Sequence, residues 1–179
     1  MRIVAGEWRG RTLKSPSWAG LRPTSDRLRE TLFNILGPAI RGARVLDGYA
    51  GTGAIGIEAL SRGAAWVCFV DNDRRATALV EANLTALGAD RRYAIIRADV
   101  TNISDACGGA AFDFAVFDPP YAPEAAAAAL DAAGQLAGGD LSVVIEHATR
   151  HAPPPRHGDF ALARTVTAGD SALSFYERG

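Results

Sequence analysis

The chain has 179 residues, of which 48% are hydrophobic and 22% charged. This length and composition are typical of one globular domain with a small extension, and they exclude a multi-domain or disordered protein. Apolar runs such as 64–70 are far shorter than the roughly 18 to 20 residues of a membrane span, and no apolar signal-peptide core follows Met1. We therefore expect a cytoplasmic protein that has no membrane partner.

The charge is distributed unevenly along the chain. Residues 1–44 carry nine basic and three acidic side chains, a net charge of +6, so that the remainder carries −7. Of the 19 basic residues, 18 are arginine, whose planar guanidinium group forms forked contacts with phosphate and stacks on bases. We interpret the N-terminal segment as facing nucleic acid, rather than as a merely solvated surface, because phosphate neutralisation dominates affinity for polyanions.

A basic extension at residues 1–42 and a larger domain at residues 43–179 are predicted. Within the extension, 2–5 and 11–14 flank a turn and are expected to pair as a small hairpin. Pro23-Thr24-Ser25 then signals a helix that continues through Leu36. Residues 37–42 would link this helix to the domain.

The helix of the extension has one apolar face, formed by Leu28, Leu32, Ile35 and Leu36. This arrangement leaves Arg27 and Arg29 available elsewhere. Glu30 and Asn34 could support a binding pocket, although ordinary polarity of a helix surface explains them equally well.

From residue 43 onward, short apolar runs alternate with helical stretches, which predicts an α/β fold with a mostly parallel sheet covered by helices. Seven strands are expected, at 45–46, 65–70, 93–98, 112–117, 141–145, 160–167 and 172–176. Helices are expected at 54–62, at 74–87 and from Pro123 onward. The last two strands alternate more strongly and are predicted to close the sheet as an antiparallel hairpin, preceded by an extended surface connection at 153–155.

A glycine-rich turn follows the first strand of the domain. The residues 51–56 fit the pattern G-x-G-x-x-G, in which absent side chains let a ligand approach the backbone at a helix N-terminus. The pattern suits a dinucleotide, an adenosyl nucleoside or a ligand-free turn. Asp71 ends the next strand, where a carboxylate can accept hydrogen bonds from ribose hydroxyls. Its alternative role is a helix cap, which Asn72 or Asp73 could also provide.

Asp47 favours one of these ligands over the others. It lies between the first strand and the glycines, where a carboxylate would repel a pyrophosphate but would attract the ammonium and sulfonium groups of S-adenosylmethionine. Asp99 ends the third strand, where its carboxylate either accepts a hydrogen bond from the adenine amino group or caps the loop.

The sequence Asp118-Pro119-Pro120-Tyr121 ends the fourth strand and is the most specific motif in the chain. The two prolines stiffen the backbone, so that the Asp118 carboxylate and the Pro119 carbonyl can point into a crevice. Two acceptors that bind the hydrogens of an exocyclic amine favour its pyramidal, nucleophilic form, and Tyr121 provides a ring on which an extruded base can stack. The alternative is a rigid turn with a core tyrosine.

Together, the glycine turn, Asp71 and the motif 118–121 resemble the class I methyltransferases that modify exocyclic amines of bases. The segments 2–11 and 21–34, and the closing segment around 174–176, resemble the RsmD family over essentially the whole chain. That family methylates N2 of a guanine in bacterial 16S ribosomal RNA. The resemblance implies a Rossmann-like class I fold, S-adenosylmethionine as cofactor, and 16S rRNA of the small subunit or its assembly intermediate as partner of a monomer.

The motifs and the resemblance together predict the site residues. Catalytic roles are expected for Asp118, Pro119, Pro120 and Tyr121. The cofactor site is expected to comprise Asp47, Tyr49, Ala50, Gly51, Gly53, Asp71, Asn72, Asp99 and Val100. RNA contacts are expected from Arg9, Arg11, Arg22 and Arg27, and no metal is expected.

Other conspicuous residues have plainer interpretations. His147, His151 and His157 have no paired acid or metal spacing and are expected to be surface or structural residues. For Cys68 and Cys107, neither a disulfide nor a zinc site is expected. Trp8 and Trp18 either stack on RNA or pack against the domain, and a salt bridge in a loop is the expected role of Glu146.

Three rival functions use the same motifs. A nicotinamide-dependent reductase would share the glycine pattern, but Asp47 and the lack of a second domain for a substrate disfavour it. A non-catalytic RNA-binding assembly factor would need only the basic extension, and the intact motif at 118–121 argues against it. A DNA adenine-N6 methyltransferase would keep the chemistry, but no separate target-recognition domain is present in the sequence.

Overall fold

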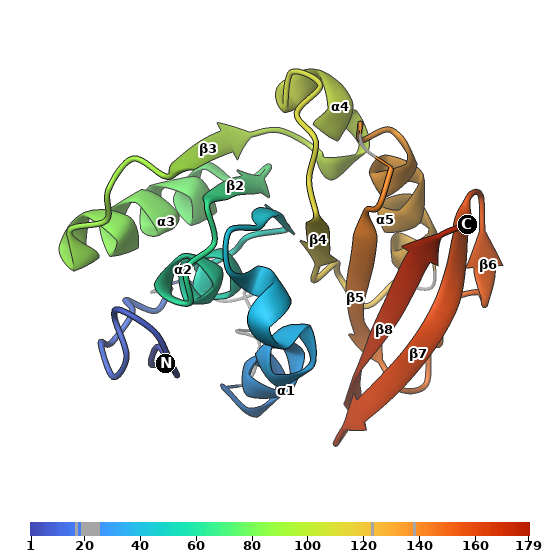
Figure 1. Ribbon diagram of the computed structural model, residues 1–179, viewed down its shortest axis with the longest axis horizontal. Coiled ribbons are helices and arrows are strands. Elements are labelled where there is room, and N and C mark those ends of the chain that lie inside the picture. Colours follow the sequence, from blue (N-terminus) through green and yellow to red (C-terminus); the bar gives the residue numbers. More distant parts are fainter. Residues whose placement is uncertain (17, 19–25, 123, 138) are drawn as a thin grey trace.

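The computed structural model describes residues 1–16, 18, 26–122, 124–137 and 139–179. One eight-stranded sheet runs through the molecule in the order β3-β2-β1-β4-β5-β8-β7-β6 (Figure 1). Its strands are β1 Arg44–Gly48, β2 Trp66–Asp71, β3 Tyr93–Arg97, β4 Phe114–Phe117, β5 Ser142–Ala148, β6 Arg156–His157, β7 Phe160–Ala168 and β8 Ser171–Arg178. Strands β1 to β5 are parallel, whereas β8, β7 and β6 continue the sheet antiparallel.

The predicted mostly parallel sheet with a closing antiparallel hairpin is therefore confirmed. The eighth strand, β6, was not predicted, because its two residues carry no apolar pattern and follow three prolines. One of these prolines, Pro153, is buried, so the connection does not run wholly over the surface as expected. Strand β5 also continues past its predicted end at 145, since β8 pairs with it as far as Ala148 opposite Ser171.

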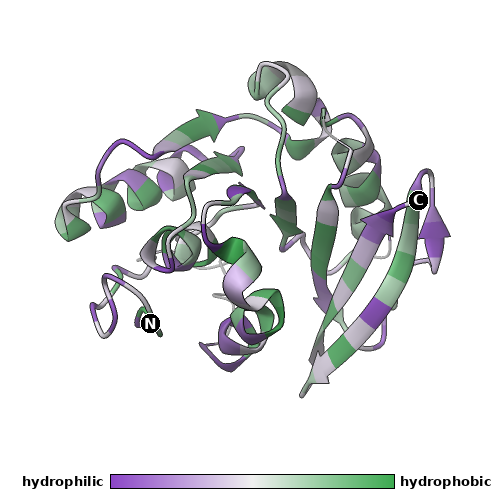
Figure 2. Ribbon diagram, viewed as in Figure 1, coloured by the Kyte–Doolittle hydropathy of each residue, from purple (hydrophilic) through white to green (hydrophobic). Residues whose placement is uncertain are grey.

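Helices cover both faces of the sheet. They are α1 Asp26–Leu36, η1 Gly37–Ile40, α2 Ala54–Ser61, α3 Arg74–Leu87, η2 Val100–Asn102, α4 Ile103–Ala106 and α5 Ala125–Gly134. Alternate residues of a strand face opposite ways, and Val45 and Leu46 of β1 accordingly lie in different apolar cores. The first core contains α1, α2 and α3, and the second contains η2, α4 and α5 (Figures 1 and 2). Pro123 and Pro23-Thr24-Ser25, predicted at helix starts, lie outside the described residues.

The N-terminal segment shares the first core. Ile3, Trp8 and Leu13 are buried there, so Trp8 packs against the domain and does not face RNA. The predicted hairpin is present as a single antiparallel bridge between Arg2 and Thr12. The 3₁₀ helix η1 occupies most of the predicted linker 37–42 and ends at Ile40, which is buried in the same core.

A buried ion cluster attaches this segment to α2, and it corrects the prediction that Arg29 is available on the helix surface. Arg29 is 0% exposed: its Nη2 donates to the carbonyl of Arg2 and to Asp26, and its Nε lies 3.7 Å from Glu58 Oε2. The Glu58 carboxylate also accepts hydrogen bonds from the backbone N–H groups of Val4 (2.8 Å) and Ala5 (3.0 Å). Sequence periodicity misassigned Arg29 because its partners come from two other segments.

Two further side-chain pairs join residues that are distant in the sequence. The Sγ atoms of Cys68 and Cys107 lie 3.7 Å apart, and both are free thiols. His157, expected to lack an acidic partner, has Asp131 Oδ1 2.7 Å from its Nε2 because β6 lies beside α5. His147 is buried and hydrogen-bonded to Ser174 Oγ at 2.9 Å, which confirms a structural role.

We predict that Glu58→Ala lowers the free energy of unfolding by about 3 kcal/mol or more. The variant removes the buried carboxylate beside Arg29, so that the exposed Asp26 is its remaining acidic partner among the described residues, and it leaves the N–H groups of Val4 and Ala5 without their acceptor. Alanine has a higher helix propensity than glutamate, so a change in helix propensity cannot be the cause of a loss of stability. Urea unfolding measures the change. The matched control is Glu30→Ala on the exposed side of α1, for which we expect a change within about 0.5 kcal/mol. Equal stabilities of the two variants would contradict the role of the cluster.

Candidate active site

The predicted site residues gather at the carboxyl edge of the parallel strands. The order of the strands reverses between β1 and β4: β2 and β3 follow on one side, and β4 and β5 on the other. Ligands of open α/β sheets bind in the crevice at such a switch point. Four carboxylates end the strands around it: Asp47 in β1, Asp71 at the end of β2, Asp99 after β3 and Asp118 after β4.

The glycine turn connects β1 to α2 in a conformation that side chains would hinder. Gly51 and Gly53 have φ angles of 55° and 76°, in the left-handed region that glycine adopts without strain. A Cβ atom on Gly56 would lie 2.3 Å from a ring carbon of Phe69, so this glycine permits the close approach of α2 to the sheet. The G-x-G-x-x-G pattern therefore corresponds to a tight turn and a closely packed helix start.

Asp47 holds the start of α2. It is 2% exposed, and its Oδ2 accepts a hydrogen bond of 2.8 Å from the Gly56 N–H. Burial raises the pKa of Asp47 well above its ordinary value, the Gly56 N–H opposes this shift, and the negative charges of Asp118 and Asp71 add to it. Asp47, Asp71 and Asp118 therefore lie close enough at neighbouring strand ends to repel one another, and this arrangement favours a positively charged ligand.

Asp71 connects the glycine turn to its own strand end. Its Oδ2 accepts from the Gly51 N–H at 2.9 Å and its Oδ1 from the Asp73 N–H at 2.9 Å. The helix cap of α3 is Asp73, whose side chain accepts from the Arg75 N–H. Capping, the alternative role of Asp71, is therefore performed by its neighbour.

Asp99 caps a short helix, as one of its two interpretations predicted. Its Oδ1 accepts from the N–H (2.9 Å) and hydroxyl (2.7 Å) of Thr101 at the start of η2. These hydrogen bonds, and one from the Asn72 side chain, hold the pKa of Asp99 below its ordinary value, so the carboxylate remains a charged acceptor. Burial, and then the charge of Asp99, raises the pKa of Tyr49. Asn72, Tyr49 and Asp99 thus lie at one side of the site, next to the buried Val100.

The turn after β4 presents its motif at the same edge. The Asp118 N–H donates to the Gly48 carbonyl at 3.3 Å, which places the turn beside the end of β1. Asp118 and Tyr121 are half-buried, Pro119 is buried and Pro120 is exposed. Tyr121 belongs to neither apolar core of the described residues, which does not support its interpretation as a core tyrosine.

The Tyr121 hydroxyl is anchored by two residues for which no such role was predicted. It donates to Glu146 Oε1 at 3.2 Å and lies 2.9 Å from Ser171 Oγ. Glu146 is a buried member of β5, 5% exposed, rather than a loop residue as expected. Only the pairing of β5 with β8 brings Ser171 here, so no local pattern in the sequence could identify it.

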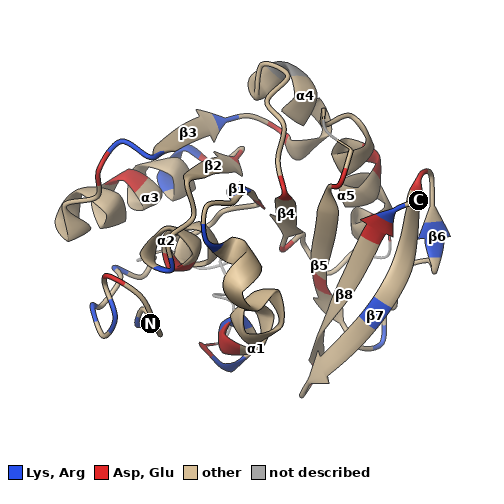
Figure 3. Cartoon of the chain, in the orientation of Figure 1, with Lys and Arg blue, Asp and Glu red and all other residues tan. Residues whose placement is uncertain are grey.

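The basic residues of the N-terminal segment divide into two groups. Arg9, Arg11 and Arg27 are all exposed. Arg11 differs from the other two because its Nη2 donates a hydrogen bond of 2.8 Å to the Ala86 carbonyl at the end of α3. In Figure 3 the N-terminal loop carries blue segments, which mark basic residues, and the start of α1 carries both blue and red ones. Arg22 lies outside the described residues. Trp18, half-buried, has the Arg75 guanidinium over its ring at 5.0 Å.

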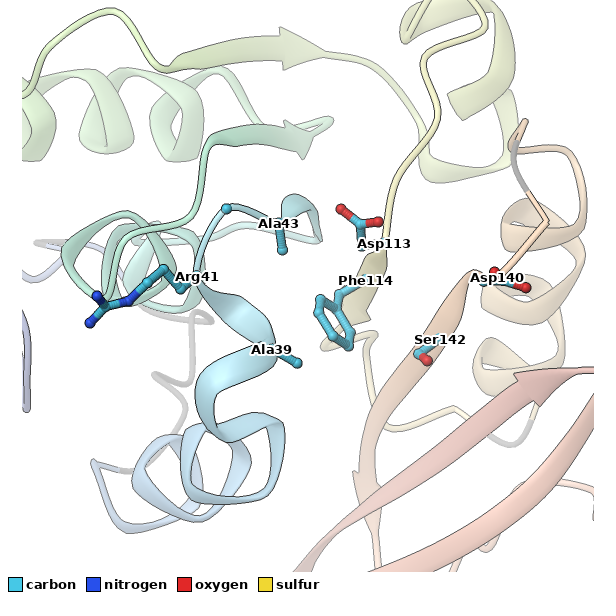
Figure 4. A pocket seen from close by; sticks show the side chains of 8 residues that line it. Ala39, Arg41, Ala43, Asp113, Phe114, Asp140 and Ser142 are labelled. Carbon is cyan, nitrogen blue, oxygen red and sulfur yellow. The ribbon is translucent and has the colours of Figure 1, made fainter.

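A hollow of about 370 Å³ lies at the opposite, amino edge of the sheet (Figure 4). It is lined by Arg41, Asp113, Phe114, Asp140 and Ser142, among others, at the starts of β1, β4 and β5. The Asp113 carboxylate is engaged there by the Arg44 N–H at 2.7 Å. None of the predicted site residues lines this hollow, so it is not part of the candidate active site. Among the helices of the described residues, none is long and apolar enough to cross a bilayer.

The strand order, the glycine turn and the acids at successive strand ends define the fold of class I S-adenosylmethionine-dependent methyltransferases. A family model described as Conserved hypothetical protein 95 matches residues 1–177, and the chain belongs to this family, the RsmD family. It is 36% identical over 181 residues to Ribosomal RNA small subunit methyltransferase D of Escherichia coli K12, covering 99% of this chain and 90% of that protein. YlbH of Bacillus subtilis is 35% identical over 182 residues, 99% of each chain. The solved structure of yhhF from Escherichia coli superposes with a TM-score of 0.86 at 33% identity, covering 99% and 97%. The protein is thus a methyltransferase.

We predict that Asp47 makes folding less favourable as the pH rises. Because burial raises its pKa in the folded state, the folded protein keeps this proton at pH values where the unfolded chain has lost it. The stability of the unaltered protein relative to Asp47→Asn should therefore be highest below about pH 4 and fall as the pH rises through the raised pKa, by about 1.4 kcal/mol per pH unit.

Urea unfolding of both proteins at a series of pH values measures this difference. Asp140→Asn, at an exposed position on the far edge of the sheet, is measured alongside as the control for replacing an aspartate with asparagine. A difference for Asp47→Asn that is constant, or that grows with pH, would refute the assignment.

Proposed function

We propose that the protein transfers a methyl group from S-adenosylmethionine to the exocyclic N2 of a guanine in the 16S rRNA of the small ribosomal subunit. The observation that carries the proposal is the rigid turn Asp118-Pro119-Pro120-Tyr121, next to the coupled carboxylates at the end of the sheet. Family membership and the name of the Escherichia coli relative, Ribosomal RNA small subunit methyltransferase D, support rRNA as the substrate class.

The residues at the carboxyl edge fit S-adenosylmethionine. Asp47, Asp71 and Asp118 bring three acidic side chains together, and the ammonium and sulfonium groups would stabilise their ionised forms. Each Asp71 oxygen accepts one backbone hydrogen bond and keeps a further lone pair, as ribose hydroxyls require. Asp99 remains ionised and can accept from the adenine amino group. When bound, the cofactor supplies a methyl group on a positively charged sulfur.

The target amine would be held by the turn after β4. The Asp118 carboxylate and the Pro119 carbonyl are acceptors for its two hydrogens, and this pairing frees the nitrogen lone pair for attack. Stacking of the extruded base on Tyr121 would contribute about 1 to 3 kcal/mol, which offsets a cost of a few kcal/mol for removing the base from its stack. Positioning of the two reactants then supplies most of the catalysis, since in-line methyl transfer needs little further chemistry.

The RNA would approach from the N-terminal side. Arg9 and Arg27 are exposed, and the Arg11 guanidinium keeps further donors beyond its bond to Ala86. Arg29, in contrast, neutralises Glu58 inside the protein and adds nothing to this surface. Phosphate contacts of this kind hold the RNA without selecting its sequence, so selection of the guanine falls to the pocket and to the shape of the RNA.

We predict that Asp118→Ala abolishes methyl transfer while S-adenosylmethionine still binds, because the variant loses an acceptor for the amine and keeps the glycine turn. Transfer of tritium from labelled S-adenosylmethionine to small-subunit particles that lack the modification, followed by mapping of the labelled nucleotide, measures the activity. Calorimetry measures cofactor binding, and NADH serves as the comparison ligand.

The matched control is Asp140→Ala, which removes an exposed acid at the far edge of the sheet. Normal turnover by Asp118→Ala would overturn the mechanism. Binding of NADH in place of S-adenosylmethionine would favour a reductase, cofactor binding without any transfer would favour an assembly factor, and label on DNA adenine would change the target.

For the RNA surface, we predict that Arg9→Ala and Arg27→Ala each weaken RNA binding and lower the salt dependence of the association constant. Loss of one phosphate contact reduces the slope of log K against log salt by about 0.7 to 0.9. Binding to a small-subunit RNA fragment at several salt concentrations measures both quantities. The control is Arg156→Ala, which alters an exposed arginine on β6 at the other end of the sheet. An equal change of the salt slope in this variant would contradict a particular role of the N-terminal arginines in RNA binding.

A further inference from the structure

We propose that Ser171 and Glu146 are positioning residues that fix the plane of the Tyr121 ring for the incoming base. The proposal rests on the proposed function, in which Tyr121 stacks against the target base. It assigns a role in substrate positioning to the closing antiparallel hairpin, which would otherwise only complete the sheet.

The hydroxyl of Tyr121 has a complete set of hydrogen bonds. It donates its single proton to Glu146 Oε1 at 3.2 Å, so it accepts from the Ser171 hydroxyl, 2.9 Å away. Glu146 is only 5% exposed, and a hydrogen bond to a desolvated carboxylate is stronger than one formed in water. The tip of the ring is thus held from two directions.

The sheet topology explains why these residues meet Tyr121. Strand β4 pairs with β5 as far as Phe117 opposite Ile145, and the chain then leaves the sheet in the turn that contains Tyr121. Beyond this point β5 continues beside β8, with Glu146 opposite Leu173 and Ala148 opposite Ser171. The part of β5 beyond the end of β4, together with the start of β8, therefore supplies both hydrogen-bond partners of the tyrosine hydroxyl.

Anchoring of the hydroxyl complements the rigidity of the backbone. The prolines at 119 and 120 restrict the main chain, but they leave the rotation of the Tyr121 side chain undetermined. A ring that is ordered before the base arrives loses less entropy when the base stacks on it, and it holds the amine in line with the methyl donor. A phenylalanine would offer the same stacking surface, so the hydroxyl is needed for orientation rather than for contact area.

A double-mutant cycle tests this role. We expect Ser171→Ala to lower kcat/KM for small-subunit RNA by about five- to tenfold, the effect of losing one hydrogen bond, and Tyr121→Phe, which loses both hydrogen bonds of the hydroxyl, to lower it at least as much. If Ser171 acts through the hydroxyl of Tyr121, the double variant should be no worse than Tyr121→Phe alone. Ser171→Thr, which keeps a hydroxyl, should restore activity, and S-adenosylmethionine affinity should be unchanged in all of them.

The matched control is Thr165→Val, which removes from the same hairpin a hydroxyl that is hydrogen-bonded to Ser174 Oγ at 2.9 Å and not to Tyr121. Glu146→Gln, which keeps an acceptor oxygen, should cause a smaller loss than Glu146→Ala, and unfolding midpoints exclude global destabilisation as the cause. Additive losses in the double variant, Ser171→Ala with full activity, or parallel losses of cofactor affinity would overturn the positioning role while the proposed function stands. Absence of transfer by the unaltered protein would overturn both.

Discussion

The rest of the site depends on the concentration of negative charge at the carboxyl edge of the sheet. Asp47 is buried, near two other carboxylates, and compensated in the described structure by one backbone N–H of α2. Such a group is costly to bury, and its cost is offset when a cation binds beside it. The same Asp47 side chain joins β1 to the start of α2 through the Gly56 N–H. The geometry of the glycine turn therefore depends on the group whose burial costs free energy. The fold thereby keeps an unfavourable feature at the place where a positively charged methyl donor would relieve it.

Helix α2 connects Asp47 to the N-terminal segment through hydrogen bonds at its two ends. Its first turn receives the Asp47 carboxylate at Gly56, and its last turns hold the N-terminal segment through Glu58 and Ser61. Gly6 allows the contact, because a Cβ at that position would lie 1.8 Å from the Ser61 carbonyl oxygen. An eight-residue helix therefore separates the glycine turn from the basic segment by a fixed distance. If the N-terminal arginines bind RNA as proposed, this helix would set the distance between the RNA phosphates and the bound donor, and positioning of this kind is what methyl transfer needs.

The sequence predicted what depends on short-range pattern and chain order. The apolar runs, the glycine turn and the acids after successive strands follow from neighbouring residues, and the parallel topology brings strand ends together without any further information. Arg29, Glu146 and Ser171 escaped prediction for a common reason: the partner that defines each role lies at least 25 residues away, on another element. Arg29 looked like a surface charge because a helix period describes only its own helix. The contact between Cys68 and Cys107 was missed in the same way.

The two halves of the sheet have different tasks in this arrangement. The parallel half ends in backbone turns and carboxylates, which suit a cationic nucleoside, whereas the antiparallel half supplies side chains that hold an aromatic ring. Parallel strands all end at one edge, so they can surround a donor there. The reversal of direction at β8 brings the start of that strand, with Ser171, back to the edge where β4 and β5 end. Under the proposed function, the closing antiparallel strand would support the acceptor base through Tyr121, while the ends of the parallel strands surround the donor.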